Sequence, residues 1–190
     1  VHWYQVNSNG EPINELGQVV DGPAYAKQVK PAEYFADNGS TGLNYNTQYT
    51  VVAKTDFADY NYYGRYIVNN GSLTPGEAAT VTLTAANSNQ HVWFAYTQSF
   101  NVVHVKFDVN ETSTVETKTT HTVELFNLTS VVSNGFIYGG AFSDAACETV
   151  QTFEEGQNAT AFTPTAGATY YIWEADAQFL SPKNLSCWNH

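Results

Sequence analysis

The sequence predicts an all-β fold: an antiparallel β-sandwich, immunoglobulin-like or jelly-roll-like, with an N-terminal extended segment. Apolar and polar residues alternate with a period of two from about residue 47 onward, which is the spacing of half-buried strands. Turn-forming residues recur about every 8–12 positions between these runs, as they do in sandwiches. With 190 residues, the chain is long enough to bury its own core.

A change of pattern divides the chain at residue 30. Residues 1–30 begin with an aromatic, strand-like run, VHWYQV, and continue as a stretch rich in glycine and proline. We predict that they form an N-terminal extended arm or the first strand of the fold. Residues 31–190 are predicted to form a glycosylated β-sandwich domain.

Strands are expected in residues 31–190 wherever alternation is clear: 48–55, 60–68, 79–86, 91–100, 102–109, 112–128, 135–142 and 169–177. A longer irregular loop is expected at 154–167. One short helix is expected at 31–37, because Pro31 suits a first helical position and Asn38-Gly39 suits a helix end.

The alternation also assigns side chains to faces. In residues 60–68 it places four residues on one face: Tyr60, Tyr62, Tyr66 and Val68. In residues 102–109 it directs His104 outward, together with Lys106 and Asp108. The same assignment points four residues inward: Val103, Val105, Phe107 and Val109.

Composition limits the classes of partner. The net charge is −11, and the chain has only seven Lys and Arg residues. A nucleic acid or an anionic membrane surface needs a basic footprint, so neither is an expected partner. The sequence contains no run of about 18 apolar residues, so membrane insertion is not expected either.

Several features predict secretion. The sequence begins at Val1 and contains no Met, which favours a removed signal peptide and an extracellular or cell-surface location. Cys147 and Cys187 are expected to form one disulfide in an oxidising compartment. Six sequons predict N-glycosylation at Asn38, Asn70, Asn110, Asn127, Asn158 and Asn184.

No motif of a known catalytic type is present, so we expect no catalytic residues, no metal and no cofactor beyond covalent N-glycans. The histidines leave one alternative open. His91 and His104 lie on strands that can be neighbours, and His2 lies near the start of the sequence. Either arrangement would make the chain a secreted copper or zinc enzyme if the imidazoles converged on a metal ion.

Aromatic residues form two groups: Tyr60, Tyr62, Tyr63 and Tyr66, and then Tyr170, Tyr171 and Trp173. Half of each group faces the core of a sandwich. The outward half can stack on sugar rings or pack against another subunit. A secreted carbohydrate-binding or adhesive module is therefore the second functional hypothesis.

The leading hypothesis is a structural subunit of an extracellular filament or coat, a homopolymer joined by β-augmentation. The β-rich leading segment, the Thr-, Asn- and Tyr-rich sandwich and the sparse charge resemble the thread-filament subunits of thermoacidophilic archaea, which are similar in architecture to type I pilins. This resemblance is one of style and covers no specific motif. It implies polymerisation by donor-strand complementation through the N-terminal arm, with four subunit-contact candidates: Val1, Trp3, Tyr4 and Val6.

Overall fold

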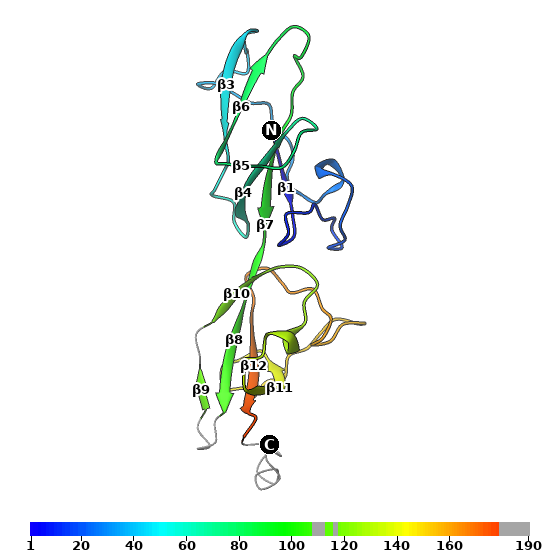
Figure 1. Ribbon diagram of the computed structural model, residues 1–190, viewed down its shortest axis with the longest axis vertical. Coiled ribbons are helices and arrows are strands. Elements are labelled where there is room, and N and C mark those ends of the chain that lie inside the picture. The colour runs from blue at the N-terminus through cyan, green and yellow to red at the C-terminus, as the bar shows by residue number, and fades with distance from the viewer. Residues whose placement is uncertain (108–112, 116–117, 179–190) are drawn as a thin grey trace. The chain divides into compact units, whose positions relative to one another are not determined.

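The computed structural model describes residues 1–107, 113–115 and 118–178, and it divides the chain into two compact units (Figure 1). We call Val1–Gln98 unit 1 and Ser99–His190 unit 2. Apart from two short 3-10 helices, η1 (Pro23–Tyr25) and η2 (Leu128–Val131), the regular elements of the described residues are strands. The predicted all-β, sandwich-like fold is confirmed. The described part of the chain has no helix of the length and apolarity needed to span a membrane.

Unit 1 contains a five-stranded sheet with the order β2-β1-β7-β4-β5 and a separate two-stranded sheet, β3-β6. Strand β1 runs parallel to β7, with Trp3 opposite Phe94, and the other described pairs in this unit are antiparallel. The strands are β1 (His2–Gln5), β2 (Gln28–Lys30), β3 (Thr47–Val52), β4 (Asn61–Val68), β5 (Thr74–Pro75), β6 (Ala78–Leu83) and β7 (Val92–Thr97).

The main core of unit 1 lies between these two sheets. Trp3, Phe94 and Tyr96 of the large sheet cluster with Val51, Ala79 and Val81 of the small one. A second cluster, on other residues of the same central strands, contains Tyr4, Val6, Ala26 and Ala95. Strands β1 and β7 are therefore apolar on both faces, as is typical of strands that have no solvent-facing side.

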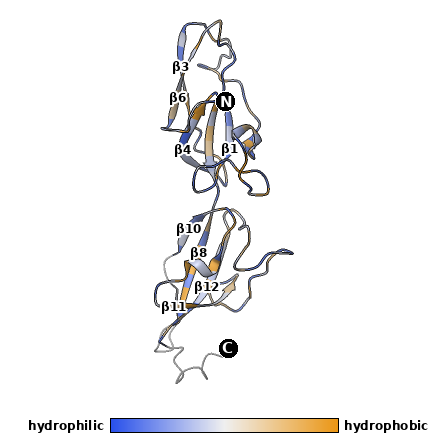
Figure 2. Cartoon of the chain, turned by 45° about the vertical axis from the view of Figure 1, so that its right-hand side comes forward, coloured by the Kyte–Doolittle hydropathy of each residue, from blue (hydrophilic) through white to orange (hydrophobic). Residues whose placement is uncertain are grey.

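Unit 2 has one sheet with the order β10-β8-β12-β11, and β9 pairs with β8 outside this path. Strand β12 runs parallel to β8, with Tyr171 opposite Val103. The strands are β8 (Ser99–Phe107), β9 (Ser113–Val115), β10 (Thr119–Thr122), β11 (Phe136–Phe142) and β12 (Thr169–Asp176). The core joins Phe100, Val102, Tyr170 and Ile172 of β8 and β12 to residues outside the sheet, among them Leu128 of η2 and Phe162 of the segment before β12. Hydrophobic residues recur along the strands of both units (Figure 2).

Most of the predicted strands match observed ones, with ends that differ by a few residues. The face predicted for residues 60–68 is also confirmed, since Tyr60, Tyr62, Tyr66 and Val68 all pack on the main core of unit 1. The long strand predicted for 112–128 is broken in the described residues into β9, β10 and the short helix η2. The five-stranded sheet of unit 1 and the sheet of unit 2 each contain a parallel pair, which the prediction of antiparallel pairing did not include.

The domain boundary differs from the predicted one. The division lies between Gln98 and Ser99, within the range 31–190 that we expected to form a single sandwich. Residues 1–30 belong to unit 1, because β1 lies inside its sheet. The local pattern does not mark this division as a domain boundary, because only Thr97, Gln98 and Ser99 separate the apolar residues of β7 from those of β8.

The helix predicted for residues 31–37 is wrong. These residues form no helix, and the backbone N–H of Glu33 donates to the carbonyl oxygen of Val1 at 3.0 Å. Asp37 pairs with Ser40 in a tight turn. Proline at position 31 biases Lys30 toward extended backbone, and the contact with the start of β1 continues that conformation.

Two glycines in the loop after β1 provide a matched test of its packing. Gly10 and Gly17 both have positive φ angles, of 80° and 75°. A Cβ atom on Gly10 would lie 2.9 Å from Cε1 of Tyr63, whereas a Cβ on Gly17 would meet nothing within 4 Å. We expect Gly17→Ala to lower the free energy of unfolding by roughly 1 kcal/mol through backbone strain alone. Gly10→Ala should lose a further ~1–3 kcal/mol because Tyr63 must move.

Urea denaturation of the two variants measures the difference. Equal losses in free energy of unfolding would contradict the packing of Tyr63 against the loop that follows β1.

Candidate functional site

Strand β1 carries the residues that the sequence singled out as subunit contacts. Trp3, Tyr4 and Val6 are all buried in unit 1 of the same chain. The ring of Trp3 packs edge-on against Phe57, with centroids 6.0 Å apart, while Tyr4 and Val6 belong to the second cluster. Val1 is only partly buried. The predicted contact residues are therefore brought together, and they fill both sides of their own sheet.

Burial of β1 contributes substantially to stability. Fully burying one large apolar side chain is worth roughly 1.5–3 kcal/mol, and β1 with the adjoining Val6 buries three: Trp3, Tyr4 and Val6. Its backbone is also bonded along both edges, to β7 in parallel and to β2 in antiparallel orientation. If β1 left this sheet, both its backbone hydrogen bonds and its apolar packing would have to be replaced elsewhere.

A histidine pair lies at the beginning of β1 and β7. Nε2 of His2 is 2.8 Å from Nδ1 of His91, and the His2 ring stacks on Trp93 with centroids 3.6 Å apart. The two imidazole centroids are 5.1 Å apart. If the two nitrogens point directly at one another, the distance between the centroids should be about the 2.8 Å nitrogen–nitrogen distance plus the radii of the two rings. The observed separation agrees with this, so the two rings meet edge to edge through these nitrogens. Such a pair shares one proton and is not arranged to hold a metal between the two rings.

The electrostatics of this pair follow from its burial. Loss of water lowers the pKa of His2 to about 4, and the nearby amino group of Val1 and the His91 ring add to the effect. Protonation of both rings would place two positive charges at hydrogen-bonding distance. With its pKa near 4, His2 is neutral at pH 7.

The metal-site hypothesis paired His91 with His104 instead. The structure places these residues in different sheets, where His91 contacts His2 and His104 contacts Glu174. The described residues contain no group of three or more His, Cys, Asp or Glu side chains that could hold a metal ion.

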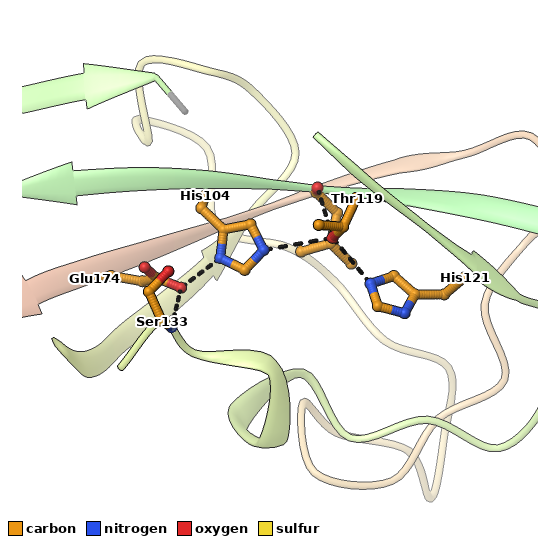
Figure 3. A network of polar contacts seen from close by, with 6 residues as sticks. His104, Thr119, His121, Ser133 and Glu174 are labelled. Atoms are coloured by element: carbon orange, nitrogen blue, oxygen red, sulfur yellow. Dashed lines mark hydrogen bonds and ion pairs between the residues drawn. The ribbon is translucent and has the colours of Figure 1, made fainter. Parts of the chain in front are cut away.

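Unit 2 contains a buried polar network centred on His104 (Figure 3). Nδ1 of His104 lies 2.5 Å from Oε1 of Glu174, and the backbone N–H of Ser133 donates to the same oxygen at 3.0 Å. On the other side of the ring, Nε2 faces the hydroxyl of Thr119 at 3.4 Å, and that hydroxyl lies 2.9 Å from Nε2 of His121. His104 is 7% exposed and Glu174 is fully buried, so this end of the network lies in the interior, whereas Thr119 is exposed and His121 is half-buried.

The outward orientation predicted for His104 is therefore wrong. In β8, Phe100 and Val102 belong to the core of unit 2, and His104 follows them at the same period of two. Glu174 follows Ile172 of β12 in the same way. Both faces of β8 are buried along Val102–Val105, so alternation in the sequence could not decide which face was the inner one.

Four of the six predicted glycosylation sites lie in the described residues. Asn38, Asn70 and Asn158 are exposed and Asn127 is half-buried, while Asn110 and Asn184 lie outside the described residues. The side chains of Asn127 and Asn158 have the same geometry, because each Oδ1 accepts from the backbone N–H and the hydroxyl of its own sequon threonine. Their amide nitrogens, which a glycan would take, make no hydrogen bond to the described residues.

Cys147 lies in a turn with a φ angle of 54°, and it is half-buried. Burial, with a contribution from the charge of Asp144, raises the pKa of its thiol to about 11. It has no disulfide partner within the described part of the chain. Its predicted partner, Cys187, lies outside those residues, so the disulfide stays a prediction.

The aromatic groups that suggested sugar binding are largely used for packing. Tyr62 and Tyr66 pack on the main core of unit 1, Tyr63 packs on its second cluster, and Tyr170 is in the core of unit 2. The most exposed tyrosines are three others, all in unit 1: Tyr25, Tyr34 and Tyr45. No periodic sequence pattern marks them, because Tyr25 ends the three-residue helix η1 and Tyr34 and Tyr45 lie in irregular segments.

Comparison with known proteins identifies no relative, since no family model, no curated protein and no solved structure matches this chain.

The buried His104–Glu174 contact predicts a large effect of removing one partner. We expect Glu174→Ala to lower the free energy of unfolding by about 3–5 kcal/mol, because the imidazole and the Ser133 N–H lose their buried acceptor. Glu155→Ala, in an exposed loop, is the control and should change stability by less than about 0.5 kcal/mol. Thermal and urea denaturation give both values. Similar small losses in the two variants would mean that the network is not held in the interior as described.

The lowered pKa of His2 predicts a pH dependence. In the unfolded chain His2 titrates near 6.5, and in the folded chain near 4, so the unfolded state binds more protons between these values. Stability should therefore fall as the pH decreases from about 6.5 to 4, with no further contribution from His2 below that. His2→Gln should reduce this loss. Part of it should remain, because burial also lowers the pKa of His121.

Urea denaturation of both proteins between pH 7 and pH 4 tests the assignment. The same pH-dependent loss in the variant and the original chain would contradict it.

Proposed function

We propose that the chain is a structural subunit of an extracellular surface filament or coat, and that its copies assemble by exchanging strand β1. The observation that carries this proposal is the position of β1, between β2 and β7 with apolar side chains on both faces. A strand bound in this way is held by main-chain hydrogen bonds and by side-chain sites on alternating faces, which is the mode of β-augmentation. The same strand from a neighbouring copy would make the same contacts.

The turn at residues 7–11 is the segment that such an exchange has to open. It is closed by the N–H of Asn7 donating to the Glu11 carbonyl at 2.9 Å, and by the N–H of Gly10 donating to the Asn7 carbonyl at 3.0 Å. Just beyond it, Ile13 donates to the carbonyl of Gln5 in β1. Once the turn is extended, that bond and the pairing with β2 and β7 can form again between copies. The hydrogen bonds that exchange loses without replacement are therefore those of one short turn.

The surface supports the same proposal. Charged residues make up only 13% of the chain, and the exposed sequon residues Asn38, Asn70 and Asn158 offer positions for N-glycans. An exterior rich in hydroxyls, amides and sugar remains hydrated without many charges. An extracellular coat that meets changing pH and salt benefits from that property, because hydration by neutral groups is little affected by screening.

An engineered disulfide distinguishes exchange from intramolecular pairing. His2 lies opposite Trp93 in the parallel register, and their stacked rings show that both side chains share one face. Neighbouring strands bring Cα atoms within the span of a disulfide. The double variant His2→Cys/Trp93→Cys should therefore give a ladder of dimers, trimers and longer species on a non-reducing gel after assembly.

The single variants His2→Cys and Trp93→Cys are the controls, and they account for any cross-linking through the native cysteines. A double variant that forms the bond but runs only as a monomer would refute strand exchange. A dimer without longer species would indicate reciprocal exchange, which closes on itself and cannot build a filament.

A further inference from the structure

Unit 1 contains a cavity of about 630 Å³ at the end where β1 and β7 begin. Its apolar wall is formed by Val51 of β3, Val81 of β6 and Val92 of β7. The volume lies within the range of about 300–1,000 Å³ that is usual for small-ligand sites. It is separate from the sites that bind the side chains of Trp3 and Tyr4, which do not line it.

Two tyrosines line this cavity and remain largely in contact with solvent. Tyr34 is 90% exposed and Tyr45 is 57% exposed. Neither hydroxyl makes a hydrogen bond to the described residues. An aromatic side chain this exposed is free to turn its ring face toward a ligand that enters the cavity. Sugar rings carry C–H groups on their faces that pack on such a surface, while their hydroxyl groups stay at the edge.

Polar side chains with no partner lie on the same cavity. Thr41, Ser88 and Asn89 line it, and their side chains make no hydrogen bond to the described residues. The neighbouring Gln90 differs, because its amide already donates to the carbonyl oxygens of Thr82 and Asn87. The amide of Asn89 and the two hydroxyls can therefore both donate to and accept from the hydroxyl groups of a ligand.

The charge of the cavity restricts the ligand further. The residues that line it include the carboxylate of Glu33 and no Lys or Arg. The Glu33 carboxylate is ion-paired with Lys30, and the one cation on the lining, the amino group of Val1, already donates to the carbonyl oxygen of Glu33. An anionic sugar would therefore meet an acidic chain of net charge −11 with no free cation to pair with it. A neutral ligand avoids this repulsion.

We infer that the cavity binds a short neutral oligosaccharide, with one sugar ring stacked on Tyr34 and its hydroxyl groups bonded to Asn89 and its neighbours. This function goes beyond assembly of the subunit. Two sources of such a ligand share the same chemistry: a free polysaccharide near the cell, and an N-glycan carried by another copy of this chain.

Saturation-transfer NMR and calorimetry on the full chain test the inference. The probes are cellotriose, maltotriose, mannotriose and triacetylchitotriose, together with the glycans released from the chain produced in its own host. We expect at least one probe to bind. Binding of the purchased trisaccharides would indicate a polysaccharide ligand, and binding of the released glycans alone would indicate a neighbouring copy.

Variants locate the binding. Tyr34→Ala should weaken it at least tenfold and Tyr34→Phe should retain most of it, because the ring and not the hydroxyl provides the stacking surface. Asn89→Ala should weaken it severalfold. Tyr25→Ala is the matched control, since Tyr25 is 72% exposed in the same unit but does not line the cavity. Unchanged thermal stability verifies that each variant is folded.

Two results would overturn the inference. One is that no probe binds, and the other is that Tyr25→Ala weakens binding as much as Tyr34→Ala does. Neither result depends on strand exchange, so this inference and the proposed assembly can fail separately.

Discussion

The parallel pairing of β1 with β7 is the contact on which unit 1 depends. Without β1, β2 would lose its place in the sheet, and the two apolar clusters that meet on the central strands would both be opened to water. Unit 2 has a comparable arrangement, in which β12 lies between β8 and β11 and runs parallel to β8. In each unit a strand far away in sequence completes the middle of a sheet. Such a strand is paired along both edges, and its sequence is correspondingly apolar, although the side chains of β12 still alternate between buried and half-buried.

A central strand supplied from a distance has a particular thermodynamic property. The contacts it makes are identical whether it comes from the same chain or from another copy, so they do not favour either state. The equilibrium between free and assembled copies is instead set by the segment that connects the strand to its own unit, here the turn at residues 7–11, and by the concentration of chains. Burial of Trp3, Tyr4 and Val6 makes the strand tightly held in both cases. A filament joined in this way would combine strong contacts with a small difference in free energy between free and assembled copies.

The same property explains what the sequence could and could not predict. Strands such as β6 have one buried face, and the alternation of Val81 with Thr80 and Thr82 was sufficient to locate them. In β8 both faces are buried, so alternation disappears and His104 was assigned to the wrong side. The parallel pairs and the division at Gln98 depend on contacts between distant residues, which a local pattern does not contain. The helix predicted at 31–37 failed for the same reason, because Glu33 bonds to Val1.

The candidate sites also differ in whether a local sequence pattern could predict them. The apolar residues of β1 were identified from the sequence because a strand leaves a continuous local pattern. The His2–His91 pair was not, since its members are 89 positions apart and only the register of β1 on β7 brings them together. Tyr34 and Tyr45 were missed for the opposite reason: they lie in segments whose conformation follows no period. What distinguishes them is exposure beside a cavity, which is a property of the folded chain alone.

The cavity and the exchanged N-terminal segment have two residues in common, Val1 and His2, and this links the two proposals physically. His2 lines the cavity and is bonded to His91, which also lines it. In an assembled filament, the His2 beside a given His91 would come from the neighbouring copy. The wall would be the same, because the contacts of β1 are the same in either case. The cavity is therefore complete in a free copy and in an assembled one, so a ligand bound there has no intrinsic preference between them. A ligand that did favour the filament would need an additional link that only a neighbouring copy supplies, and an N-glycan attached to the adjacent chain is the one of the two proposed sources that is tethered in that way.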